Sequence, residues 1–234
     1  EKYNIPILED AAEAHLSEFN SPKSGTIGDI GIFSFTPSKL MTTGEGGMIV
    51  TNNDLLAEKC RYIRNFGDKN KFEWEMLGFN FRMMDINAAI GLVQLKYLPE
   101  FIEKRVELAN KYINNLKDVD NIILPKTNKN TIHNYQLFTI RINQNELKNV
   151  NLLMIENLKK LGINSRLYYP ALHQQNVFKK YGPYNDYEYK NTLVYTNTAF
   201  SIPIYPGLSD SNLKKICESI KQISKQISKT IKSY

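Results

Sequence analysis

The stretch "GIFSFTPSKLMTTGEGGMIVT", residues 31–51, places a single lysine, Lys39, between an apolar run and a loop with three glycines. The apolar run, residues 30–35, is short and bounded by polar residues, which is typical of a strand in a sheet covered on both faces. Two more runs of this kind, residues 5–8 and 48–51, lie on either side of it. The pattern predicts an α/β sheet with Lys39 just beyond the end of a strand.

Length and composition limit the class of protein. A chain of 234 residues can form one large or two modest domains, and its 42% hydrophobic residues suit a globular core. No apolar run approaches the roughly 18 residues of a membrane span, and the first residues do not resemble a signal peptide. Cys60 and Cys217 lie far apart, without His or Cys at metal-binding spacing, so neither disulfides nor a metal site is expected. These features predict a cytoplasmic protein with no membrane partner.

The formal charge of +6 is concentrated partly near the end of the chain. Because no arginine or aromatic residue interleaves there, a solvated helix face is favoured over a nucleic-acid site. The lysines concerned are Lys214, Lys215, Lys221, Lys225, Lys229 and Lys232.

The order of patterns predicts three segments: residues 1–85 in an α/β domain, bridging helices over 86–120, and a small α+β domain over 121–234. Asn53 or Asp54 begins a predicted helix, and Pro99 separates an apolar helix from an amphipathic one that ends near Lys117. The last segment contains a strand in "YQLFTIRI", a helix in "ELKNVNLLMIENLKKLG" and a final helix after "GLSD". Since the chain starts with a strand and lacks an initiator Met, we expect it to be the later part of a longer protein.

Three polar residues near the strand ends suggest a chemistry. Asp10 ends the first predicted strand and Ser34 lies near the end of the next, so both can reach one crevice at the sheet edge. A lysine that faces such a crevice loses solvation, which favours the neutral amine that condenses with carbonyls. A solvated surface charge is the alternative for Lys39. The combination suits pyridoxal phosphate, which needs an acid at its ring nitrogen, a hydroxyl at its phosphate and an amine at its aldehyde.

The blocks "EDAAEAH", "GDIGIFSFTPSK", "TTGEGGMIVTNN", "LGFNFRMMDINAAIGLVQL", "LYYPALH" and "FSIPIYPGLSD" cover nearly the whole chain. In combination they resemble the DegT/DnrJ/EryC1 family of sugar aminotransferases. The resemblance implies the type I, aspartate aminotransferase-like fold of pyridoxal-phosphate-dependent transferases, with part of the large domain present here. It also implies pyridoxal 5'-phosphate as cofactor, with pyridoxamine phosphate as its intermediate form.

By this resemblance, Lys39 corresponds to the Schiff-base lysine, Asp10 to the partner of the pyridine nitrogen and Ser34 to a phosphate ligand. Asn80 in "GFNFR" corresponds to a residue that reaches the phosphate of the neighbouring subunit, which implies a homodimer with shared active sites. Glu13 stands where many relatives carry a glutamine facing the phenolic oxygen. A carboxylate there would repel a phenolate unless the two share a proton.

Further candidates have structural alternatives. Arg82 either binds a nucleotide-sugar phosphate or caps its loop, and Tyr168 and His173 in "LYYPALH" either contact the sugar or pack. His15 and His133 are expected to be structural. Ala88, Ala89 and Gly91 are expected to allow close helix packing at the dimer interface.

The resemblance implies transfer of an amino group from glutamate to a nucleotide-linked 4-keto-6-deoxy sugar, as in amino sugar and polysaccharide biosynthesis, with a leaning toward perosamine-type synthases. Two alternatives stay open. Sugar dehydratases of the same family carry His at the lysine position, and Lys39 argues against that activity. A non-catalytic sensor or binding protein would keep the fold without the reaction, and the sequence leaves open whether this chain is active or binds the cofactor alone.

Overall fold

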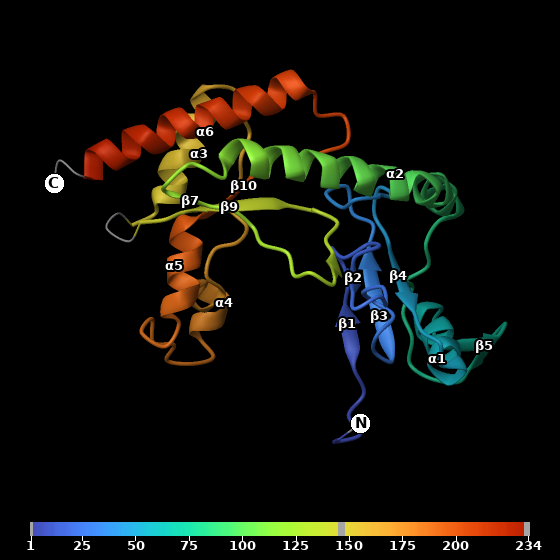
Figure 1. Ribbon diagram of the computed structural model, residues 1–234. Coiled ribbons are helices and arrows are strands. Elements are labelled where there is room, and N and C mark those ends of the chain that lie inside the picture. Colours follow the sequence, from blue (N-terminus) through green and yellow to red (C-terminus); the bar gives the residue numbers. More distant parts are fainter. Residues whose placement is uncertain (1, 145–147, 232–234) are drawn as a thin grey trace. The chain divides into compact units, whose positions relative to one another are not determined.

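The computed structural model describes residues 2–144 and 148–231 (Figure 1). Contacts within the chain divide it into two compact units. Unit 1 comprises Glu1–Lys104 and Thr127–Gln136, and unit 2 comprises Arg105–Lys126 and Leu137–Tyr234. These divisions differ from the predicted ones, since residues 127–136 return to unit 1. The assignment of the predicted segments to a large domain, a bridge and a small domain stays a prediction.

Unit 1 contains a three-stranded sheet of β1 (Leu8–Asp10), β3 (Ile30–Ser34) and β4 (Gly47–Val50). β3 lies in the middle, parallel to β1 and antiparallel to β4. β2 (Glu18–Phe19) pairs with β8 (Thr131–Ile132), which belongs to the returning segment. The sheet therefore places the ends of β1 and β3 at one edge.

The first strand differs from its prediction over residues 5–8. The ladder with β3 begins only at Leu8, because Ile7 is held by Asp29 instead: the Asp29 carboxylate accepts from the Ile7 amide at 2.7 Å. The expected cover on both faces is also absent for several side chains. Leu8 is 64% exposed, and Met48 and Ile49 are 49% and 48% exposed.

Helix α1 (Asp54–Arg64) begins where its sequence predicts. The Asn53 side chain accepts hydrogen bonds from the amides of Leu55 and Leu56, at 3.0 and 3.2 Å. This satisfies two of the amides that a helix start leaves without partners. The chain then forms a hairpin of β5 (Asp68–Asn70) and β6 (Glu73–Trp74).

Helix α2 (Asp85–Leu116) is one continuous helix of 32 residues (Figure 1). The predicted separation into two helices at Pro99 is therefore wrong. Proline removes one amide donor and one intrahelical hydrogen bond. The side chains on either side of Pro99 keep the helix together through burial, since Leu98 is 2% and Ile102 7% exposed.

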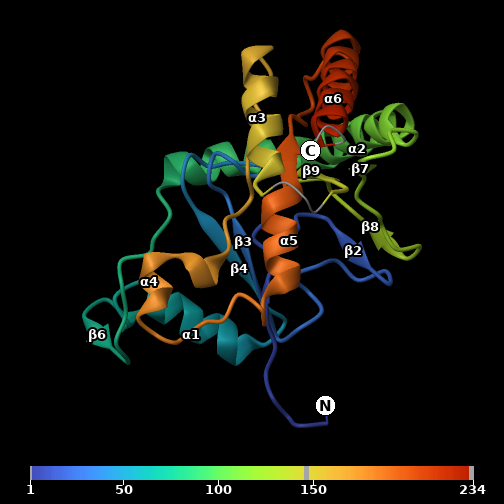
Figure 2. The ribbon, with the colours of Figure 1, turned by 90° about the vertical axis from the view of Figure 1, so that its left-hand side faces the viewer.

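Unit 2 contains an antiparallel sheet in the order β10 (Ala199–Ile202), β9 (Phe138–Ile142), β7 (Ile122–Ile123). Alternate residues of β9 are fully buried, as a strand with one covered face requires. Helices α3 (Val150–Lys160) and α6 (Asp210–Ile231) contact each other (Figure 2). The helix predicted from residue 146 thus begins at Val150, and residues 145–147 lie outside the described ones.

The remaining helices of unit 2 are the turn η1 (Leu172–Gln174), α4 (Asn176–Lys179) and α5 (Lys190–Thr198). Helix α6 buries an isoleucine face that includes Ile216, Ile220 and Ile223, and it exposes its lysines at positions 214, 215, 221 and 225. Within residues 2–144 and 148–231, no helix is both long enough and apolar enough to cross a membrane.

Candidate active site

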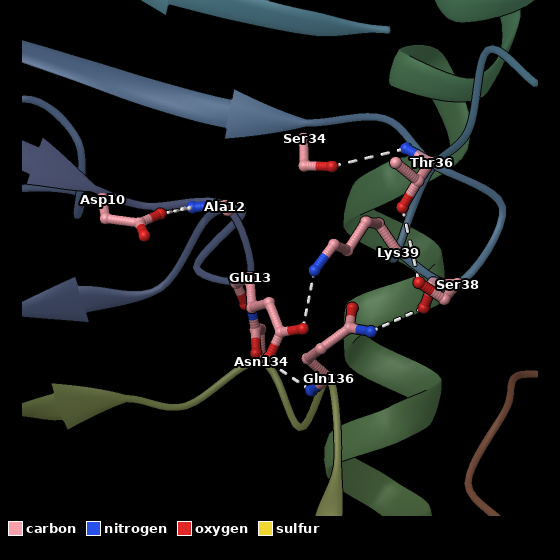
Figure 3. Close-up of polar contacts among 9 residues, drawn as sticks. All are labelled: Asp10, Ala12, Glu13, Ser34, Thr36, Ser38, Lys39, Asn134 and Gln136. Carbon is pink, nitrogen blue, oxygen red and sulfur yellow. Dashed lines mark hydrogen bonds and ion pairs between the residues drawn. The ribbon is translucent and has the colours of Figure 1, made fainter. Parts of the chain in front are cut away.

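Asp10 and Ser34 end neighbouring parallel strands, with Asp10 opposite Ile32 in the register. Each side chain accepts a hydrogen bond from the backbone just beyond its strand. The Asp10 carboxylate accepts from the Ala12 amide at 3.1 Å, and the Ser34 hydroxyl from the Thr36 amide at 3.5 Å. An acid and a hydroxyl therefore lie at the same edge of the sheet, each at the start of a loop (Figure 3).

Lys39 lies in the loop after β3, and its side chain points toward the loop after β1 (Figure 3). Its Nζ lies 2.6 Å from Glu13 Oε1, with the two side chains 14% and 39% exposed. A mostly buried ammonium needs a counter-charge, which the Glu13 carboxylate supplies. The structure thus brings Lys39 and Glu13 together at the edge where Asp10 and Ser34 end their strands.

The glycine-rich segment after Lys39 forms a tight turn. Gly44 and Gly46 have φ angles of 82° and 157°, and a Cβ on Gly46 would lie 2.5 Å from the Thr43 hydroxyl. The Phe35 amide donates to the Gly46 carbonyl, while Phe35 O accepts from the Thr43 amide. The turn therefore closes the lysine loop onto the end of β3.

His15 lies buried beneath this edge, at 4% exposure. Its ring lies 5.3 Å from that of Phe33 and 5.9 Å from that of Phe35. Burial lowers the pKa of His15, the nearby Ser34 backbone opposes the shift, and the charge of Lys39 adds to it. A neutral imidazole that packs between aromatic rings is the state this environment favours.

Asn80 and Arg82 lie in an exposed segment between the β5–β6 hairpin and α2. Arg82 Nε donates to Asn80 Oδ1 at 3.1 Å, and its guanidinium lies 5.0 Å above the Phe66 ring. The backbone of Asn80 pairs with Asn65, at the end of α1. The structure brings these two candidates to each other and to Phe66, and it shows them in contact with neither Asp10 nor Lys39.

Tyr168 and His173 belong to unit 2. The Tyr168 and Tyr169 rings meet edge to face at 4.7 Å. His173 stacks on Tyr189 at 4.5 Å, and its Nε2 lies 3.1 Å from the Asp186 carboxylate. His173 and Asp186 help to line a cavity of about 630 Å³, together with Gln174, Lys179, Gly182, Pro183 and Tyr184.

Two residues that contact the lysine site were missed at the sequence level. Asn134 and Gln136 lie in the returning segment of unit 1, and their side chains donate to the Glu13 and Ser38 carbonyls at 2.8 and 2.6 Å. The residues joined by these two contacts are 121 and 98 positions apart in the sequence. The sequence itself shows only two amide residues just before a predicted strand, and their contacts cannot be read from it.

Sequence comparison shows that this chain is similar to known enzymes of amino sugar formation. GDP-perosamine synthase of Caulobacter vibrioides is 33% identical over 225 residues, which are 95% of this chain and 60% of that protein. UDP-4-amino-4,6-dideoxy-N-acetyl-beta-L-altrosamine transaminase of Campylobacter jejuni is 30% identical over an alignment of 237 positions, gaps included, which covers 97% of this chain and 61% of that protein. The chain thus spans about 60% of the length of these relatives.

Solved structures of aminotransferases have a fold similar to that of this chain. Helicobacter pylori PseC, an aminotransferase involved in the biosynthesis of pseudoaminic acid, superposes with a TM-score of 0.85 at 28% identity, covering 96% of this chain and 61% of that one. The aminotransferase TlmJ of Streptoalloteichus hindustanus gives 0.87 at 26% identity, covering 97% and 60%. The predicted fold class is confirmed. A model of the DegT/DnrJ/EryC1/StrS aminotransferase family matches residues 1–221, and the chain belongs to that family.

Proposed function

We propose that this chain carries the catalytic lysine of a cytoplasmic sugar aminotransferase that uses pyridoxal phosphate. The observation that carries the proposal is the Lys39 amine, paired with Glu13 at the sheet edge where Asp10 and Ser34 end their strands. The donor set fits this cofactor, because it offers an amine for an aldehyde, a carboxylate for a ring nitrogen and a hydroxyl for a phosphate.

When bound, the cofactor supplies an electron sink that stabilises negative charge at the carbon attached to nitrogen. The residues of the chain do the rest. Asp10 would hold a proton on the ring nitrogen, Ser34 would donate to the phosphate, and Glu13 would lie beside the phenolic oxygen. Lys39 would hold the aldehyde group, and its free amine would accept and return protons at the substrate carbon.

For the substrates we propose glutamate as amino donor and a nucleotide-linked 4-keto-6-deoxy sugar as acceptor. The names of relatives, which include GDP-perosamine synthases and the altrosamine transaminase, support a nucleotide sugar. Arg82, Tyr168 and His173 are the residues we propose for its recognition. Amino sugar formation for a surface polysaccharide is the proposed role, which also suits the similarity to a spore coat polysaccharide biosynthesis protein of Bacillus subtilis.

We also propose that the enzyme is a homodimer in which Asn80 completes the partner's cofactor site. The segment around Asn80 is apolar and exposed: Phe79 is 55%, Phe81 68% and Met84 63% exposed. Such a surface needs cover in water, which a second copy of the chain would provide. Gly91 does not belong to this surface, because it is buried and its missing Cβ faces Thr43 of the same chain.

Borohydride reduction tests the central assignment. The full-length protein is incubated with pyridoxal phosphate, reduced and mapped by mass spectrometry, and we expect the label on Lys39. Label on another lysine, with none on Lys39, would contradict the assignment of Lys39 as the lysine that binds the cofactor. A panel of nucleotide keto sugars, each incubated with glutamate, then identifies the acceptor.

A further inference from the structure

The segment His133–Gln136, which leads into β9, forms a tight turn that hydrogen bonds from its own side chains stabilise. Tyr135 has a φ of 49°, which is a left-handed backbone conformation that residues other than glycine rarely adopt. His133 Nδ1 accepts from the Tyr135 amide at 2.9 Å, and Asn134 Oδ1 accepts from the Gln136 amide at 3.0 Å. These two bonds hold the turn, so the side chains of Asn134 and Gln136 leave it in fixed directions.

Asn134 fixes the loop after β1. Its Nδ2 donates to the carbonyl of Glu13 at 2.8 Å and to that of His15 at 3.1 Å. The residue is 2% exposed. Because a buried carbonyl without a donor costs free energy, this amide stabilises the loop in the conformation that carries Glu13.

Gln136 fixes the loop after β3. Its Nε2 donates to the Ser38 carbonyl at 2.6 Å, and the residue is 8% exposed. Ser38 immediately precedes Lys39, so this bond restrains the backbone from which the lysine side chain extends. Asn134 and Gln136 thus hold the two backbones whose side chains meet in the ion pair between Glu13 and Lys39 (Figure 3).

We propose that Gln136, supported by Asn134, is a positioning residue that sets where the Lys39 amine lies. Lysine has a long flexible stem, so the place of its amine depends on a fixed backbone and a fixed partner. Misplacement of a reacting group by about 1 Å can cost roughly a hundredfold in rate. The inference rests on the proposed function, since it concerns the reaction of Lys39.

The first test is Gln136→Glu in the full-length protein. The new side chain has the same shape, but its carboxylate cannot donate to Ser38 O. With pyridoxal phosphate bound, the half-reaction with glutamate is followed by absorbance in single turnovers. We expect the rate at saturating glutamate to fall about ten- to a hundredfold, with little change in the glutamate concentration for half-maximal rate. The fraction of Lys39 labelled by borohydride should fall as well.

A pH profile separates positioning from a general loss of structure. In Gln136→Glu the introduced carboxyl group, once protonated, can again donate to the Ser38 carbonyl, so the ratio of variant to wild-type rate should rise as the pH falls. Glu13, His15, His133, Tyr135 and Lys39, the titratable groups of this cluster, occur in both proteins, but the introduced carboxylate shifts their pKa values. Gln136→Asn adds no titratable group, so its ratio to the wild type gives the background, and only a rise beyond that background supports the hydrogen bond. A ratio that does not change with pH would contradict the role of this hydrogen bond.

Two further variants complete the test. Gln222→Glu makes the same charge change at an exposed position of α6 and should leave rate and labelling unchanged. Gln136→Asn introduces no charge but is too short to reach Ser38, so it should reproduce the loss even if Gln136→Glu does not fold. Wild-type rate and labelling in Gln136→Asn overturn the inference. Absence of label on Lys39 in the wild-type protein overturns the proposed function instead.

Discussion

The Asp10 carboxylate lies at the end of β1, where an amide would fit the same space and accept the same bond from Ala12. We expect Asp10→Asn to fold normally but to lose at least about a hundredfold in turnover, or about 2.7 kcal/mol of barrier. The reason is that an amide cannot keep the cofactor's ring nitrogen protonated. Steady-state kinetics beside a thermal denaturation curve measure the two effects. Unchanged turnover would contradict the proposed role.

His15 connects the site to the pH dependence of stability. Burial lowers its pKa in the folded protein, so the unfolded chain binds the proton more readily. The contribution of neutral His15 is therefore complete above its ordinary pKa of about 6.5 and is lost as the pH falls through the lowered value. We expect His15→Phe to remove this part of the acid sensitivity.

Urea denaturation between about pH 7 and 5 measures how the free energy of unfolding depends on His15. This range is chosen because the ordinary pKa of histidine is about 6.5. The free energy of unfolding should fall less steeply in the variant than in the wild type. His133, whose pKa burial also lowers, stays in both proteins and sets the common background. Equal slopes for the two proteins would show that His15 does not contribute.

At the scale of elements, Glu9 holds the loop that leads into β3. Its carboxylate accepts from the amides of Gly25, Ile27 and Gly28 at 2.8, 2.6 and 2.6 Å. Although burial opposes the charged form, these three donors together lower the pKa of Glu9. Since Glu9 and Asp10 point to opposite sides of β1, one holds the sheet while the other faces the site.

We expect Glu9→Gln to lower the free energy of unfolding by about 2 kcal/mol, because its amide NH₂ would face a backbone donor. Urea denaturation at neutral pH measures this change. Glu18→Gln, which only breaks an ion pair with Lys23 at the surface, should cost less than about 1 kcal/mol. An equal loss of unfolding free energy in the two variants would show that the Glu9 hydrogen bonds stabilise the fold no more than a surface ion pair does.

Local signals predicted some elements well. The cap at Asn53 and the strand at residues 30–34 follow from short patterns whose partners are close in sequence. Pro99 misled the prediction, since burial of its neighbours outweighs one lost helix bond.

Long-range contacts could not be predicted in the same way. The lysine, acid and hydroxyl candidates were found because strand ends gather polar groups. The pair formed by Glu13 and Lys39 and the donors on Asn134 and Gln136 depend on how distant segments meet. No periodicity or spacing within a window of sequence carries that information.

At the scale of the whole molecule, the proposed dimer can be tested by mixing inactive parents. Asn80→Ala and Lys39→Ala proteins are combined under conditions of subunit exchange. If sites are shared, each heterodimer has one site with both residues intact, so activity should return. A mixture of Asp10→Asn and Lys39→Ala is the matched control, because both residues come from the same chain and no site is restored. No recovery in the first mixture, with exchange verified, would refute the cross-subunit role.

The return of residues 127–136 to unit 1 also has a consequence for biosynthesis. A nascent chain that has grown only to Lys104 already contains Asp10, Ser34 and Lys39 but lacks the segment that holds their loops. Ser38 and its donor Gln136 are 98 positions apart, which at ribosomal speed is roughly 5 to 20 seconds of synthesis. During that interval the lysine loop leaves the ribosome without its distant hydrogen bonds. The loop contacts at this edge of the sheet therefore have to wait until translation has passed α2 and the first residues of the second unit.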